Sequence, residues 1–100
     1  MVNRKYNIVY INYFGSQQID VPKTANGYVA INRGDTLVTV NGLDLLPRLA
    51  TNLSGESTGV QGNADEIFVG NNGSLQIVFT PGGGVSKVVI GWKFYIDEVC

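Results

Sequence analysis

The feature that most constrains the fold of this chain is an alternation of apolar and polar side chains with a period of two residues. From residue 87 to residue 97 every second side chain is large and apolar: Val88, Ile90, Trp92, Phe94 and Ile96. Successive side chains of a β-strand point to opposite faces, so this pattern predicts a strand with one buried face. The same period predicts a strand from Leu75 to Thr80, and we expect Pro81–Gly84 to close the two into a hairpin.

Other segments are rich in the β-branched and aromatic residues that strands favour. Asn41–Gly42 suits a two-residue type I′ turn, and Gly70–Gly73 suits a turn that would make the last three strands a meander. Seven or eight short strands predict an all-β protein, a small antiparallel β-sandwich that is Ig-like or jelly-roll-like. The further expected strands are Tyr6–Phe14, Gln18–Val21, Tyr28–Ile31, Thr36–Val40, Leu43–Leu46 and Glu66–Val69.

Residues 1–100 have the length of a single domain. We expect at most one short helical turn, near residues 46–53, because Pro47 suits a helix start and apolar residues recur there at helical spacing. Ser54–Asn63 is rich in Gly, Ser and Asn and predicts a long loop. The predicted core consists of Leu37, Val38, Val40, Leu75, Ile77, Phe79, Val88, Ile90, Trp92 and Phe94.

The residue types that usually carry catalysis and metal binding are scarce. The chain has no histidine, and its one cysteine is Cys100, so histidine-dependent triads are excluded and a zinc site is not expected. Neighbouring acids such as Asp65 and Glu66 point to opposite faces of a strand and do not converge. We therefore expect no enzyme, no cofactor and no metal. Two alternatives stay open, a carboxylate pair of Asp44 with Asp97 and calcium binding around residues 63–66.

The charge of the chain is low and evenly distributed. Seven Lys and Arg against eight Asp and Glu give a net charge of −1 without runs, which predicts no steering toward nucleic acid or a membrane. The sequence contains no apolar stretch of about 20 residues and no signal-peptide pattern at its start. We expect the protein to be made in the cytoplasm.

Tyrosines mark the surfaces on which we expect a partner. The segment Tyr6–Phe14 is apolar on both of its faces, which predicts a strand that is sandwiched or lies against a partner chain. The candidate contact residues are Tyr6, Tyr10, Tyr13 and Tyr95, since tyrosine is enriched at protein interfaces. Tyr95 would alternatively stack on a glycan, and the first tyrosines with Arg4 and Lys5 would alternatively bind single-stranded nucleic acid.

Arg33-Gly34-Asp35 is the tripeptide that integrin ligands use. It falls between two expected strands, where Gly34 favours a turn and Asp35 can accept a hydrogen bond from the backbone. We interpret it as an exposed loop that connects strands, with adhesion as the alternative.

The stretch Gly34–Pro47, GDTLVTVNGLDLLP, resembles a hairpin of small phage virion proteins, including auxiliary or decoration proteins of the capsid. The resemblance implies a non-enzymatic structural protein of the virion that acts through contacts with a coat-protein lattice or with its own copies. A small carbohydrate-binding or single-stranded nucleic-acid-binding β module is the alternative function.

Overall fold

The computed structural model describes residues 5–47 and 57–96, and within these ranges the chain is all-β with no helix. The predicted fold class is therefore confirmed. Eight strands are present in the described ranges: β1 (Lys5–Tyr13), β2 (Gln17–Asp20), β3 (Gly27–Asn32), β4 (Val38–Val40), β5 (Leu43–Leu45), β6 (Ser57–Val60), β7 (Ser74–Phe79) and β8 (Val88–Ile96).

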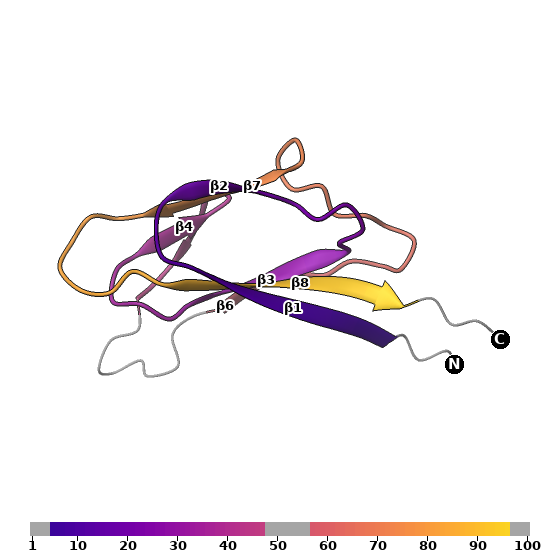
Figure 1. The fold of residues 1–100 in the computed structure, drawn as a ribbon, viewed down its shortest axis with the longest axis horizontal. Coiled ribbons are helices and arrows are strands. Elements are labelled where there is room, and N and C mark those ends of the chain that lie inside the picture. The colour runs from indigo at the N-terminus through magenta and orange to yellow at the C-terminus, as the bar shows by residue number, and fades with distance from the viewer. Residues whose placement is uncertain (1–4, 48–56, 97–100) are drawn as a thin grey trace.

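The strands form two antiparallel sheets that face each other (Figure 1). Sheet A has the order β1-β8-β3-β6, and sheet B has the order β2-β7-β4-β5. The chain pairs with itself as one long hairpin, β1 with β8, β2 with β7, β3 with β6 and β4 with β5. The hairpin is then rolled, so that β3 also pairs with β8 and β4 with β7. This is the jelly-roll arrangement, one of the two predicted sandwich types.

The tip of the long hairpin is the predicted Asn41–Gly42 turn. Both residues have positive φ, 51° for Asn41 and 88° for Gly42, as a type I′ turn requires, and the turn joins Val40 to its partner Leu43. The Asn41 amide also donates to the Gln76 carbonyl oxygen at 2.7 Å, which ties the tip to β7.

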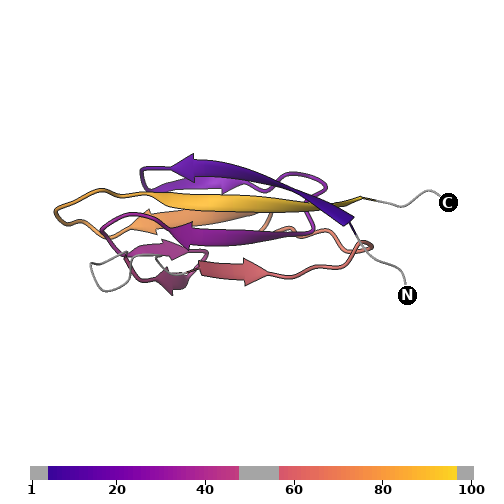
Figure 2. The same cartoon turned by 90° about the horizontal axis from the view of Figure 1, so that it is seen from below.

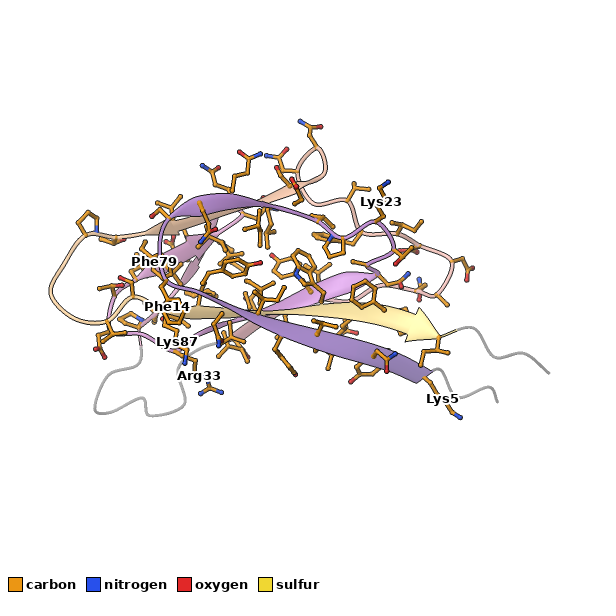
Figure 3. The ribbon with its side chains drawn as sticks, in the orientation of Figure 1. Lys5, Phe14, Lys23, Arg33, Phe79 and Lys87 are labelled. Carbon is orange, nitrogen blue, oxygen red and sulfur yellow. The ribbon has the colours of Figure 1, made fainter. Side chains whose placement is uncertain are left out.

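The hydrophobic core fills the space between the two sheets, where Figure 3 shows Phe79 among the enclosed side chains while Lys5 and Lys23 point outward. All of the predicted core residues are buried except Leu37 and Phe94, which are half-buried. An aromatic group extends the core, since the Tyr28 ring lies 5.2 Å from that of Phe68 and 6.1 Å from that of Trp92. The buried apolar residues absent from the prediction are Ile19, Ala25, Tyr28, Ala30 and Leu45.

A buried asparagine holds each end of β3. Asn26 accepts a hydrogen bond from the Tyr95 amide at 3.1 Å and donates to the carbonyl oxygens of Asn63 and Glu66. Asn32, with no exposed surface, donates to the carbonyl oxygens of Thr36 and Leu45 and accepts from the Gly34 amide. The two side-chain amides thus satisfy backbone groups of the loops at 33–36 and 63–66 and of the strands β5 and β8.

Two expected features of the C-terminal region are wrong. Glu66–Val69 is not a strand: only Phe68 points into the core, with its amide bonded to the Ala25 carbonyl oxygen, while Ile67 and Val69 are exposed. The three-strand meander is also wrong, because β7 and β8 belong to different sheets. The glycine-rich segment at Pro81–Gly84 therefore crosses between the layers instead of closing a hairpin.

Other boundaries differ by smaller amounts. Part of the predicted Ser54–Asn63 loop is β6, which pairs with β3. The strand expected from Thr36 starts at Val38, because Thr36 belongs to the preceding turn. Leu46 and Pro47 are not helical, and the rest of the helical turn predicted near residues 46–53 lies outside the described residues.

We predict that Asn32→Ala lowers the free energy of unfolding by about 2–4 kcal/mol, because it leaves three buried backbone groups without their partners. The measurement is urea unfolding followed by tryptophan fluorescence, since Trp92 is in the core. Asn12→Ala, at an exposed position of β1, is the matched control and is expected to change stability by less than about 0.5 kcal/mol. Equal stability of the two variants would contradict the role of the Asn32 amide.

Stability is predicted to fall in alkaline solution because burial raises the pKa of Tyr28 above its ordinary value of 10.0. The folded state keeps this hydroxyl protonated at a pH where the unfolded chain loses the proton. The contribution is therefore complete below pH 10.0 and is lost as the pH rises through the higher folded pKa. Thermal unfolding between neutral pH and about pH 11 is expected to show a shallower decline for Tyr28→Phe than for the parent. Identical declines would show that Tyr28 does not contribute.

Candidate functional site

The outer face of sheet A is the most unusual surface of the described structure. In antiparallel sheets, directly paired residues share a face, so the register defines which side chains point away from the core. Tyr28, Ala30 and Asn32 of β3 are buried against Trp92, Ile90 and Val88, and their neighbours in each strand therefore point outward. The outward residues of sheet A are Tyr6, Ile8, Tyr10, Asn12, Gly27, Val29, Ile31, Ser57, Gly59, Val89, Gly91, Lys93 and Tyr95.

This outer face is apolar, whereas that of sheet B is polar. Among the described residues, the sheet A face carries one charged side chain, Lys93. The outward residues of sheet B are Gln18, Asp20, Thr39, Asp44, Ser74, Gln76 and Val78. An antiparallel sheet with one solvated face normally alternates apolar inward and polar outward residues. Sheet B follows this rule and sheet A does not, so the sheet A face is the candidate functional surface.

Two glycines, Gly91 and Gly59, lie in the middle of the sheet A face. Gly91 lies between Tyr10 and Val29 in the register, and a Cβ atom built on it would come within 2.9 Å of two carbon atoms of the Tyr10 ring. The Tyr10 ring therefore lies over the β8 backbone, yet it remains 58% exposed. Gly59, opposite Val29 on β6, likewise leaves Val29 uncovered on that side. Apolar side chains gathered on one face suit contact with another protein surface.

The predicted contact residues Tyr6 and Tyr95 lie opposite each other on this face. Their ring centroids are 6.2 Å apart with planes at 78°, and the Lys93 ammonium group is 5.4 Å from the Tyr6 ring centroid. The two rings are thus arranged edge to face and do not form a coplanar platform for a sugar or a base. With Tyr10, they form the aromatic part of the face.

Tyr13 lies on the opposite side of β1 from the other three tyrosines. It pairs with Val88, so it points toward the core and is half-buried, and burial raises its pKa. The structure therefore brings Tyr6, Tyr10 and Tyr95 together but not Tyr13. Val9 and Ile11 share the inward side with Tyr13 but remain exposed, because β1 forms one edge of sheet A. Of the two predicted environments for this strand, the sandwiched one is wrong.

The Arg33-Gly34-Asp35 turn is bound to the segment 85–87 that precedes β8. The Asp35 amide donates to the Val85 carbonyl oxygen, the Val85 amide donates to the Asp35 carboxylate at 3.2 Å, and the Arg33 amide donates to the Lys87 carbonyl oxygen. Figure 3 shows the side chains of Arg33 and Lys87 next to each other. Arg33 and Asp35 are exposed as expected, whereas Gly34 is buried. These bonds give the tripeptide a structural role at the end of β3.

The remaining candidate sites are not assembled in the described part of the chain. Residues 5–47 and 57–96 contain no cluster of three acids or other metal-binding side chains. Asp44 accepts a hydrogen bond from the Thr39 hydroxyl on the outer face of sheet B, while Asp97 lies outside the described residues. At the alternative calcium site around residues 63–66, the side-chain amide of Asn63 donates a hydrogen bond to the Glu66 carboxylate at 2.9 Å. Two shallow cavities of about 270 and 250 Å³ flank Phe68.

The fold and this face define the class of protein as a jelly-roll β-sandwich with one apolar sheet face. No family model matches the chain, and no curated protein matches it significantly. No helix in the described part of the chain is long and apolar enough to cross a membrane. The face must therefore be interpreted from its own chemistry.

Sequence reasoning missed the aliphatic part of the sheet A face. The two-residue period already places Ile8 with Tyr6 and Tyr10, but Val29, Ile31 and Val89 join them only because of the register between β1, β8 and β3. The available signal was the presence of apolar residues on both sides of β1 and of β3, which is unusual for strands of a sheet with a solvated face.

We predict that Gly34→Ala destabilises the protein by about 2 kcal/mol or more, because overpacking against backbone cannot be relieved by rotating a side chain. A Cβ atom at position 34 would lie near the Val85 carbonyl oxygen and the Lys87 nitrogen. Gly15→Ala is the matched control, since nothing lies within 4 Å of a Cβ atom there. Thermal unfolding of both variants is the measurement, and a stable Gly34→Ala variant would refute the tight contact.

Proposed function

We propose that this protein is a non-enzymatic assembly protein that docks on a larger protein lattice through the outer face of sheet A. The observation that carries the proposal is the contrast between the apolar face of sheet A and the polar face of sheet B. Exposed apolar surface gives a favourable free energy of binding when a partner removes it from water. Aromatic residues and few charges are features of the centre of protein interfaces.

The lattice that we propose is a virion, with the protein as an auxiliary or decoration component. The resemblance of Gly34–Pro47 to phage virion proteins supports this, and that stretch contains β4, β5 and the turn at the tip of the rolled hairpin. Jelly rolls also recur in viral capsid proteins, although they recur in lectins as well, so the fold supports the proposal only by analogy.

The glycan and nucleic-acid alternatives receive less support from the same surface. Stacking on a sugar or a base requires a freely approachable ring, and Tyr6 and Tyr95 contact each other edge to face. The face carries one described cation, Lys93, where a nucleic-acid surface needs several. Contact with another protein would use the aliphatic side chains, the tyrosines and the low charge of the face together.

The first test is sedimentation of a lysate from the native source on a density gradient, with the chain located by mass spectrometry. An assembly component is expected in the fractions that contain large particles. Recovery only among small soluble proteins at the top would refute the virion proposal.

We predict that Val29→Glu abolishes binding of the purified protein to such particles without unfolding it. The substituted carboxylate would lie at the middle of the apolar face, where a partner would have to desolvate it. Val78→Glu is the matched control, because Val78 is an outward valine on the central strand β7 of the polar sheet B face and is 43% exposed. Cosedimentation is expected to fall at least tenfold for Val29→Glu and to stay unchanged for Val78→Glu. Equal losses would show that the two faces do not differ in function.

A further inference from the structure

The outer edge of β1 is the most accessible site for adding another strand to this molecule. Four strands form the edges of the two sheets, and β1 has nine residues, whereas β2 and β6 have four and β5 has three. In Figure 2, β1 (indigo) lies at the upper side of the molecule toward its end and crosses in front of β8 (yellow) toward its start. Within the described residues, nothing pairs with its far side.

β1 also lacks the devices with which proteins protect edges. Soluble proteins blunt exposed edges with short strands, prolines, bulges or charged side chains. β1 contains no proline, pairs with β8 without interruption over all nine residues, and has a single charge, Lys5, at its very start. An unprotected edge of this length favours strand addition.

We propose that two copies of the chain associate by antiparallel pairing of their β1 strands. This inference rests on the proposed assembly function and identifies its first partner as a second copy. A twofold axis through Val9 would pair all nine residues, with Val9 facing its own counterpart. The two sheets A would then form one continuous sheet of eight strands, and their apolar outer faces would lie on the same side.

The side chains of β1 are self-complementary in this register. Ile8 of each copy lies opposite Tyr10 of the other on the outer face, an aromatic and β-branched pair that stabilises antiparallel strands. The two Lys5 residues lie at opposite ends of the paired strands, each opposite Tyr13. No like charges therefore meet along the interface.

The pairing also explains the exposed apolar residues of β1 that the sheet A face does not use. Val9 and Ile11 point toward the core side but remain exposed at the open edge of the sandwich. The exposed apolar side chains of this edge and its backbone offer on the order of 500 Å² per copy, below the roughly 800 Å² of a standard interface. A weak, concentration-dependent dimer is therefore expected.

The test exploits the self-pairing of Val9. Sedimentation equilibrium of the purified full chain should show the mass rising from 10.8 kDa toward twice that value between about 10 µM and 1 mM. Val9→Lys and Val9→Glu should each be monomeric, because like charges would face each other at the axis, and an equimolar mixture should recover the dimer. Leu43→Lys on the β5 edge is the matched control, because Leu43 and Val9 are both 48% exposed, and it should dimerise like the parent.

Each other outcome overturns the proposal. A parent that is monomeric at 1 mM, or a Val9→Lys variant that dimerises like the parent, would exclude self-pairing through β1. Failure of the mixture to recover the dimer would exclude the register centred on Val9.

A crosslinking experiment avoids the risk that the charged variants fail to fold. Val9→Cys in a Cys100→Ser background should form a disulfide-linked dimer when oxidised glutathione is added. Asn7→Cys in the same background should not, because its counterpart would lie about four residues, on the order of 13 Å, along the partner strand. Linkage at equal rates for both variants would refute the register.

The dimer test and the docking test fail independently. Val29 lies on β3, separated from β1 by β8, so Val29→Glu should remain dimeric while it loses particle binding. Val9 is not on the outer face, so Val9→Lys leaves the proposed docking surface unchanged. Its dimer is measured in purified protein, without any particle.

Discussion

The rest of this structure depends on the two buried asparagine side chains that hold the ends of β3. In sheet A, β3 pairs with β8 on one side and with β6 on the other. Both pairings require that the loops before and after β3 hold the strand in one register. Asn26 joins the start of β3 to the loop at 63–66 and to β8, and Asn32 joins its end to the 33–36 turn and to β5. Because each amide is buried, its hydrogen bonds are not exchanged for bonds to water, and losing one costs more than at the surface.

Local patterns predicted the elements well and their pairing poorly. The alternation in β7 and β8 and the Asn41–Gly42 turn depend on neighbouring residues, and all three appear where expected. Apart from β4 and β5, the paired strands of this jelly roll are remote in sequence. The glycine-rich Pro81–Gly84 segment is equally compatible with a hairpin or a crossing between sheets. β6 was missed because Ser57–Val60 contains a glycine and polar residues, and β3 supplies the pairing that makes it a strand.

The difference between local pattern and strand pairing also explains how much of the candidate site was predictable. Tyrosines are conspicuous in a sequence, and Tyr6, Tyr10 and Tyr95 do gather on one face. Tyr13 does not join them, because it lies an odd number of residues from Tyr10 on the same strand. The aliphatic half of the face required the register, since Val29 is ordinary in sequence and distinctive only beside Gly91 and Gly59.

The double-sided apolar character of β1 has one physical explanation that covers both of its sides. A monomer gains little from Tyr10 on the outer face or from Val9 at the open edge, because both remain about half in contact with water. The other three edge strands are short, so the exposed apolar side chains along sheet edges are concentrated on β1. Pairing of two β1 strands would cover the edge and would also join two outer faces into one surface of twice the width. A larger continuous apolar face binds a flat partner more strongly, since both copies are held by one association event and the second contact becomes intramolecular. Under the proposed assembly function, the edge of β1 and the outer face of sheet A are two parts of a single surface.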